Sequence, residues 1–200
     1  STLSKRLSAT GKPIPLIAET GGQNAMIVDS SALTEQVVAD VLASAFDSAG
    51  QRCSALRLLC LQEEVADHTL AMLRGALAEL RIGPTSQISV DVGPVISAQA
   101  RMNIDAHIAA MRQRGLRTEQ SHLGPDTEQG TFVPPTIIEI SSVHDLGPEV
   151  FGPVLHVLRY RREALSALID AINATGYGLT FGLHTRINEV TASVTSRISA

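Results

Sequence analysis

Apolar residues recur at helical spacing in five segments of the chain. Within each segment they fall three or four positions apart, so they would share the face of a helix that packs on a core. These stripes cover residues 33–45, 70–80, 104–111, 165–172 and 190–198. Ser31 and Asn188 stand where helix N-caps are expected, and Gly115 follows the third stripe, where a left-handed C-terminal residue is expected. The pattern therefore predicts five amphipathic helices.

Short aliphatic runs alternate with these helices. They cover residues 14–18, 25–28, 56–61, 132–140, 154–158 and 181–184. Runs this short, without alternating polar residues, suit strands that are buried on both faces, as a parallel sheet requires. Pro134-Pro135 places the start of one run at an edge or in a bent approach to the sheet. The alternation predicts an α/β fold, a three-layer α/β/α sandwich with a mostly parallel sheet.

Composition limits the function classes that fit this fold. The 200 residues make about one domain, and 44% hydrophobic with 18% charged residues exclude a disordered chain. A net charge of −4, with lysine only at positions 5 and 12, argues against a nucleic-acid binder. No apolar run is long enough to span a membrane. Two cysteines, and histidines without ligand spacing, predict no metal site. No secretory leader is recognisable, so we expect a cytoplasmic location.

The two cysteines lie in different surroundings. Cys60 falls inside an aliphatic run, where a thiol behaves as a small hydrophobe. Cys53 follows the small residues of segment 48–50, and the charge of Arg52 would favour its thiolate form. Cys53 is therefore a candidate nucleophile, although a single cysteine in a loop is often incidental.

Two further segments combine a carboxylate with glycine. Glu19 follows an expected strand and precedes Gly21-Gly22. Ligands of α/β sheets collect outside the carboxyl ends of strands, so Glu19 could face a cleft, or it could cap the next turn. In segment 149–153 an acid and an aromatic residue stand two positions apart between two Gly-Pro pairs.

Taken together, these segments closely resemble the NAD-dependent aldehyde dehydrogenase superfamily. The family's elements E-L-G-G, G-Q-x-C, E-x-F-G-P and N-x-x-x-Y-G-L-x match residues 19–22, 50–53, 149–153 and 173–180, in that order. Thr20 departs from the usual leucine of the first element. Segments 17–25 and 46–55 are most similar to the branch that oxidises glutamate γ-semialdehyde to glutamate in proline catabolism.

The resemblance implies which residues act in catalysis. Cys53 would attack the aldehyde and carry a thioester, and Glu19 would activate the water that hydrolyses it. Ser54, directly after the nucleophile, would contact the substrate. Residues 1–200 would be a catalytic domain truncated at both ends, without the cofactor-binding domain and the oligomerisation flap.

The resemblance also implies the cofactor and its contacts. The cofactor would be NAD, with FAD only in the separate proline dehydrogenase part found in that branch. Glu149 would accept hydrogen bonds from the ribose beside the nicotinamide, and Phe151 would pack against the cofactor. The main chain of Thr20 and Gly21 would lie near the nicotinamide.

Two other functions stay open from the sequence. Cys53 could pair with a histidine in a cysteine hydrolase. The chain could also be a folded, non-catalytic module that docks against the missing NAD-binding domain. Its expected partners are therefore a small aldehyde and that domain of the same chain, with no nucleic acid or membrane, and the full-length protein would be a homo-oligomer. We expect the isolated fragment to be inactive.

Overall fold

The computed structural model describes residues 21–199, which contain a six-stranded sheet in the order β3-β4-β5-β2-β1-β6. All neighbouring strands are parallel except β3 and β4, which are antiparallel. The strands are β1 (Asn24–Val28), β2 (Leu56–Gln62), β3 (Thr118–Gln120), β4 (Thr136–Ile140), β5 (Val154–Tyr160) and β6 (Phe181–His184).

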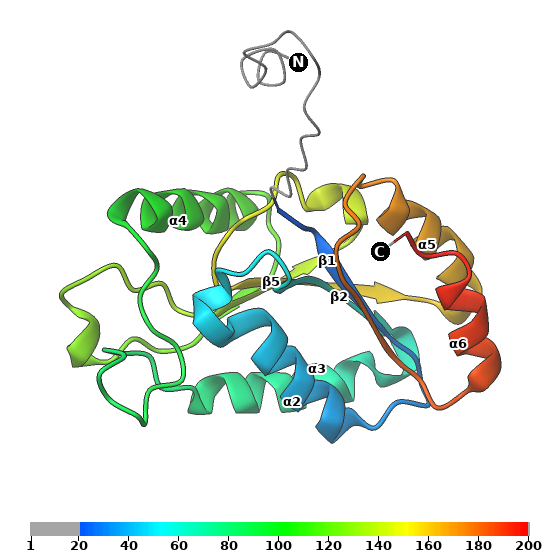
Figure 1. Ribbon diagram of the computed structural model, residues 1–200, viewed down its shortest axis with the longest axis horizontal. Coiled ribbons are helices and arrows are strands. Elements are labelled where there is room, and N and C mark those ends of the chain that lie inside the picture. The colour runs from blue at the N-terminus through cyan, green and yellow to red at the C-terminus, as the bar shows by residue number, and fades with distance from the viewer. Residues whose placement is uncertain (1–20, 200) are drawn as a thin grey trace, which may run out of the picture.

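Helices cover both faces of this sheet. In Figure 1, α2 and α3 lie below the sheet, while α4 and α5 lie above it. The bounds of the helices are α2 (Thr34–Phe46), α3 (Glu63–Glu79), α4 (Ala98–Gln113), α5 (Leu165–Asn173) and α6 (Asn188–Thr195). The predicted three-layer α/β/α sandwich with a mostly parallel sheet is confirmed.

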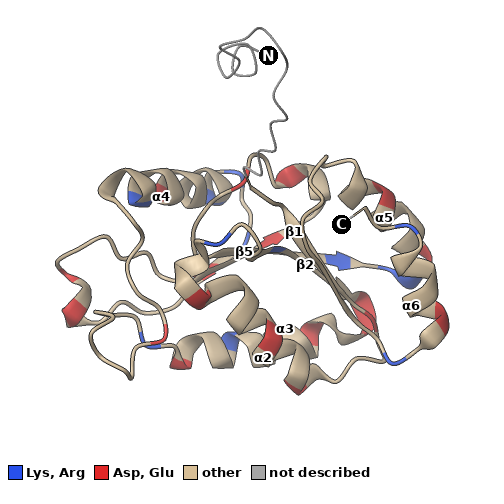
Figure 2. Ribbon diagram, in the orientation of Figure 1, with Lys and Arg blue, Asp and Glu red and all other residues tan. Residues whose placement is uncertain are grey.

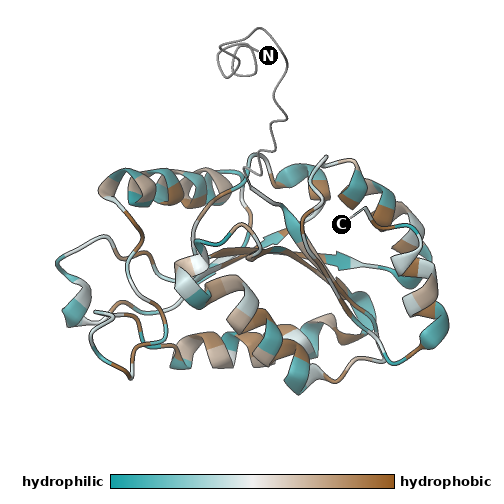
Figure 3. Ribbon diagram, viewed as in Figure 1, coloured by the Kyte–Doolittle hydropathy of each residue, from teal (hydrophilic) through white to brown (hydrophobic). Residues whose placement is uncertain are grey.

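The core sits between the sheet and the helices. Every residue of β1 and β2 is buried, as their aliphatic sequences predict. Figure 3 shows the central strands in brown, and Figure 2 shows acidic and basic residues interspersed along the helices. Within residues 21–199, no helix is long and apolar enough to cross a membrane.

Several details of the predicted elements differ. The N–H and Oγ of Ser31 bind the carboxylate of Asp29 at 2.7 and 2.6 Å, so Ser31 does not cap α2, whose N-cap is Leu33. Helix α6 begins at Asn188 itself, which therefore is not its N-cap. Gly115 adopts a φ of +79° after α4, as expected.

The Pro134-Pro135 pair precedes β4, which begins at Thr136 and lies inside the sheet rather than at its edge. The edge position belongs instead to β3, a short strand that the sequence pattern did not predict. The predicted strand at residues 14–18 lies outside the described residues.

The parallel register places the beginnings of several strands at one edge. Asn24 pairs with Leu56, and Thr136 pairs with Val154. Phe181 pairs with Ala25 beside them. The loops that precede β1, β2, β5 and β6 therefore meet at the amino edge of the sheet, and these loops carry the sequence motifs. The sequence led us to expect a site at the carboxyl edge because of Glu19, which lies outside the described residues. The motif segments that the structure describes gather instead at the amino edge.

Candidate active site

The loop that carries Cys53 is bent by three consecutive left-handed residues. Ser48, Ala49 and Gly50 have φ values of 56°, 52° and 64°. A Cβ on Gly50 would lie 2.2 Å from the carbonyl oxygen of Gly152, so this position must be glycine. Left-handed backbone is strained for the other two residues, and such strain is commonly kept at functional sites. The bend reverses the chain between α2 and β2 and brings Cys53 to the sheet edge.

The two thiols lie in opposite environments. Cys53 is exposed, whereas Cys60 is fully buried in β2. Burial raises the pKa of the Cys60 thiol because the apolar core disfavours its thiolate. The prediction that Cys60 is a core residue is confirmed, because its side chain is fully buried. Cys53 is accessible, and its role as nucleophile stays a prediction.

Gly22 is the point where the three motif segments meet. Its N–H donates to Glu149 Oε2 at 3.0 Å. A Cβ on Gly22 would lie 2.8 Å from the carbonyl oxygen of Cys53, and one on Gly21 would lie 2.0 Å from Glu149 Oε2. The two glycines therefore let the backbone approach the acid of one segment and the nucleophile loop of another.

Arg57 ties the Cys53 loop to segment 149–153. It lies in β2 and is only 1% exposed. Its guanidinium donates to Glu149 Oε1 at 3.3 Å, to the Gly152 carbonyl at 3.0 Å and to the Arg52 carbonyl at 3.3 Å. Burial lowers the pKa of Arg57, and the charge of Glu149 opposes that effect. The sequence interpretation missed Arg57, although a charged residue inside an aliphatic run was the available signal.

Glu149 and Phe151 line an open hollow beside the Cys53 loop. The hollow has a volume of about 260 Å³ and also contacts Gln51 and Ile104. Glu149 is 11% exposed and Phe151 is 45% exposed. The Arg57 guanidinium carbon lies 5.4 Å from the centre of the Phe151 ring, within cation–π range.

Ser54 faces a second hollow, of about 200 Å³, between the starts of β1 and β6. Ser44 and Thr180 line the same hollow. Thr180 Oγ1 donates to the Ser54 carbonyl at 3.5 Å. The segment that matches N-x-x-x-Y-G-L-x is thereby joined to the nucleophile loop.

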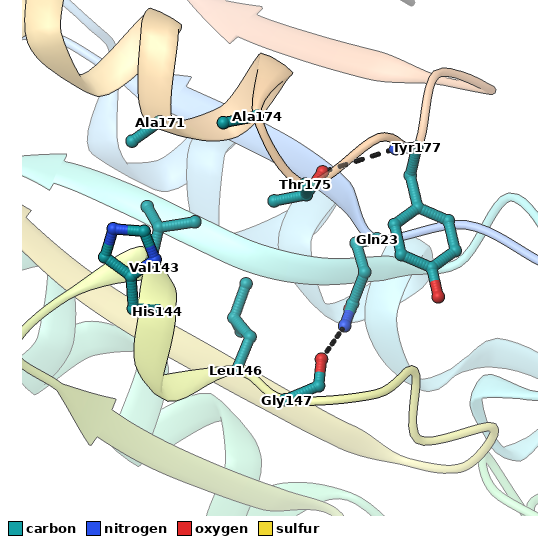
Figure 4. Close-up of a pocket in the computed structure, with 9 residues that line it drawn as sticks. All are labelled: Gln23, Val143, His144, Leu146, Gly147, Ala171, Ala174, Thr175 and Tyr177. Carbon is teal, nitrogen blue, oxygen red and sulfur yellow. Dashed lines mark hydrogen bonds between the residues drawn. The ribbon is translucent and has the colours of Figure 1, made fainter.

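A third hollow, of about 210 Å³, lies between α5 and the segment that precedes Glu149. Figure 4 shows the Gln23 amide reaching the Gly147 carbonyl, at 2.9 Å, with the Tyr177 ring beside it. The Tyr177 N–H donates to Thr175 Oγ1 at 3.4 Å. Gln23 thus connects the start of β1 to the loop that leads to Glu149.

The structure thus brings five predicted site residues to one edge: Gly21, Cys53, Ser54, Glu149 and Phe151. Glu19 and Thr20 lie outside the described residues. No cluster of three potential metal ligands occurs in residues 21–199.

Two histidines bind each other rather than a cysteine. The Nε2 atoms of His107 and His156 lie 2.9 Å apart, and His156 Nδ1 lies 3.2 Å from the Arg57 carbonyl oxygen. Burial, with neighbouring His107, lowers the pKa of His156 to about 4. These contacts engage the two rings away from Cys53, so neither His107 nor His156 supports a Cys–His hydrolase.

Comparison with known proteins agrees with this arrangement. The model of the aldehyde dehydrogenase family matches residues 2–200. The chain belongs to the aldehyde dehydrogenase family. The resemblance drawn from the four motifs is confirmed.

Some members of the family are close relatives. The bifunctional protein PutA of Klebsiella aerogenes is 63% identical over 198 residues, and that of Escherichia coli K12 is 62% identical. In each case the match covers 96% of this chain and 15% of the relative, so the chain spans less than a sixth of those proteins.

Solved structures of family members share the fold. A crystal structure of bifunctional proline utilization A has a TM-score of 0.91 at 50% identity, over 98% of this chain and 20% of that one. Methylmalonate-semialdehyde dehydrogenase from Oceanimonas doudoroffii has a TM-score of 0.83 at 29% identity, over 89% of this chain and 37% of that one. The fold described above is therefore shared with both of these solved structures.

Proposed function

We propose that this chain supplies the reacting residues of an NAD-dependent aldehyde dehydrogenase that converts L-glutamate γ-semialdehyde to glutamate in proline catabolism. Family membership and the similarity to bifunctional PutA proteins support the substrate. The observation that carries the reaction is the meeting at Gly22, which bonds to Glu149 and packs against the Cys53 carbonyl.

Cys53 is suited to act as the nucleophile. Cys53 is exposed, and its chain neighbours Gln51 and Ser54 line two hollows. Sulfur is also a strong nucleophile near neutral pH. In the first step the thiolate forms a C–S bond to the aldehyde carbon, and the carbonyl electron pair moves to oxygen. The N–H of Cys53 would donate a hydrogen bond to that oxyanion.

Glu149 and Phe151 would hold NAD, which would supply a hydride acceptor for the carbon bonded to Cys53, so that Cys53 would then carry a thioester. Glu149 can hold a ribose hydroxyl because each carboxylate oxygen has a second lone pair beyond its bond to Gly22 or Arg57. Phe151, nearly half exposed in the same hollow, offers an apolar face to the cofactor. The hollow therefore fits a polar ribose next to a flat ring.

Glu19 would complete the cycle. Its carboxylate takes a proton from water, the water oxygen bonds to the thioester carbon, and the Cys53 thiolate leaves. The product is a carboxylic acid and the cysteine returns to its starting state. A carboxylate in a partly dry pocket is suited to this task because desolvation raises its proton affinity.

The wider setting is also a proposal. The NAD-binding domain, the oligomerisation flap and an FAD-dependent proline dehydrogenase part would lie elsewhere in the full-length protein, which would be a cytoplasmic homo-oligomer. We expect residues 1–200 alone to be inactive because the NAD-binding domain is missing from them.

The test compares Cys53→Ala with Cys60→Ser in the full-length protein. Reduction of NAD by glutamate γ-semialdehyde should be abolished in the first variant and retained in the second, followed by absorbance of the reduced cofactor. Glu19→Gln should give a burst of reduced cofactor equal to the enzyme and then slow turnover. Wild-type turnover in Cys53→Ala would refute the proposal.

A further inference from the structure

The Asn24 side chain is committed to three backbone groups around the nucleophile loop. Asn24 is the first residue of β1 and is 4% exposed. Its Nδ2 donates to the carbonyl of Cys53 at 2.7 Å and to that of Ala55 at 2.8 Å. Its Oδ1 accepts the N–H of Thr180 at 3.2 Å. One buried amide therefore joins the beginnings of β1, β2 and β6.

We propose that Asn24 is a positioning residue for the Cys53 nucleophile, an inference that rests on the function proposed above. Cys53 lies in an exposed turn that is closed by the N–H of Ala55 donating to the Arg52 carbonyl at 3.0 Å. That bond closes the turn but does not fix the plane of the peptide after Cys53. The Asn24 amide fixes it by holding the Cys53 carbonyl directly.

Peptide planarity makes this restraint act on the nucleophile. Because the peptide unit is rigid, holding its carbonyl oxygen leaves little freedom for the Cα of Cys53 to rotate or shift. Gly22 lies beside this hydrogen bond, because a Cβ there would come within 2.8 Å of the Cys53 oxygen and 3.0 Å of Asn24 Nδ2. The carbonyl and the amide thus pack against Gly22, and the position of the Cα that carries the Cys53 side chain is restrained.

No other side chain of similar size supplies the same bonds. Aspartate has the shape of asparagine but would turn carboxylate oxygens toward two carbonyl oxygens, with no proton to donate. Serine keeps one donor on a shorter side chain. Asn24→Asp should therefore release the loop, and Asn24→Ser should release it in part.

Asn173, which is half-buried, offers a control with the same side chain. Its Nδ2 donates to the Arg197 carbonyl at 2.8 Å, and its Oδ1 accepts the Ser199 N–H at 2.9 Å. Asn173→Asp therefore makes the same chemical exchange in a backbone-bridging amide at the end of α5. Its effect measures what an asparagine-to-aspartate change does to folding without touching the nucleophile loop.

The experiment measures each variant in the full-length protein, normalised to the folded fraction. The readouts are kcat, the KM for NAD, and the rate constant for alkylation of Cys53 by iodoacetamide as a function of pH. Because a misplacement of about 1 Å can cost roughly 100-fold in rate, Asn24→Asp should lower kcat at least about tenfold, with the KM for NAD changed less than about twofold. Its alkylation profile should shift in pH, Asn24→Ser should be intermediate, and Asn173→Asp should match wild type.

Two results would overturn the inference. One is wild-type kcat and alkylation in folded Asn24→Asp. The other, if that variant does not fold, is wild-type behaviour in Asn24→Ser. The Cys53→Ala variant distinguishes failure of this inference from failure of the proposed function. If Cys53→Ala is active, the proposed function and the role of Asn24 are both refuted. If Cys53→Ala is inactive and either result above is found, only the role of Asn24 is refuted.

Discussion

Replacement of Arg57 by methionine tests the buried ion pair that joins two motif segments. The change removes the guanidinium, whose hydrogen bonds reach Glu149 and the carbonyls of Gly152 and Arg52. Methionine fills much of the aliphatic volume of arginine but donates no hydrogen bond. Among residues 21–199, Glu149 then keeps its bond from the Gly22 N–H.

The expected loss follows from the burial of the pair. Removing one partner of a buried ion pair costs about 3–5 kcal/mol because the other charge stays buried and unpaired. Glu149 is 11% exposed and can regain some hydration, so the lower end, about 3 kcal/mol in free energy of unfolding, is expected for Arg57→Met. Adding Glu149→Gln should recover part of this loss, because it removes the unpaired charge.

Urea denaturation of the wild type, Arg57→Met, Glu149→Gln and the double variant measures the loss in free energy of unfolding and the coupling between the two residues. Because the pair is buried, the coupling should change little with salt. Arg161→Met is the control, since Arg161 pairs with Glu163 at the surface and should leave the midpoint unchanged. A loss below about 1 kcal/mol for Arg57→Met, with no coupling to Glu149→Gln, would show that the pair does not hold the site together.

Two further predictions concern the bend and the histidine pair. Gly50→Ala should lower both the melting temperature and kcat, because a left-handed alanine costs about 1–2 kcal/mol and its Cβ would meet the Gly152 carbonyl; unchanged values of both would contradict this. His156 is held neutral with a folded-state pKa of about 4 against 6.5 when unfolded, so the unfolded state binds the extra proton. The free energy of unfolding should therefore be constant above pH 6.5 and fall by about 3 kcal/mol as the pH drops toward 4. Urea denaturation at a series of pH values measures this change. An equal dependence on pH in His156→Gln would assign the effect to other groups.

The layers of the fold could be predicted from sequence because burial alone decides them. Residues of β1 and β2 are buried on both faces, so their aliphatic runs identify them without knowledge of their neighbours. Helix caps were less predictable because side chains compete for the same groups. Ser31 looks like a cap, but Asp29, which is buried at the end of β1, binds it instead. Strand β3 has only intermediate burial and no distinctive pattern.

The members of the candidate site could be proposed from motifs, whereas its supporting residues could not. Gly21, Cys53 and Glu149 stand in recognisable motifs. Arg57 binds Glu149, which is 92 positions away, and Asn24 binds Cys53, which is 29 positions away. These contacts exist only once β1, β2 and β5 lie side by side. The edge of the sheet at which the site lies was unpredictable for the same reason. It depends on which strands the motif loops precede.

The central claim is that Cys53 carries the acyl group during turnover. Glu19→Gln full-length protein, mixed with glutamate γ-semialdehyde and NAD and quenched in acid, allows the acyl group to be located by peptide mass spectrometry. The mass of a glutamyl group should be found on the peptide that contains Cys53, in an amount equal to the burst of reduced cofactor. A burst without that adduct, or with the adduct on Cys60, would contradict the assignment.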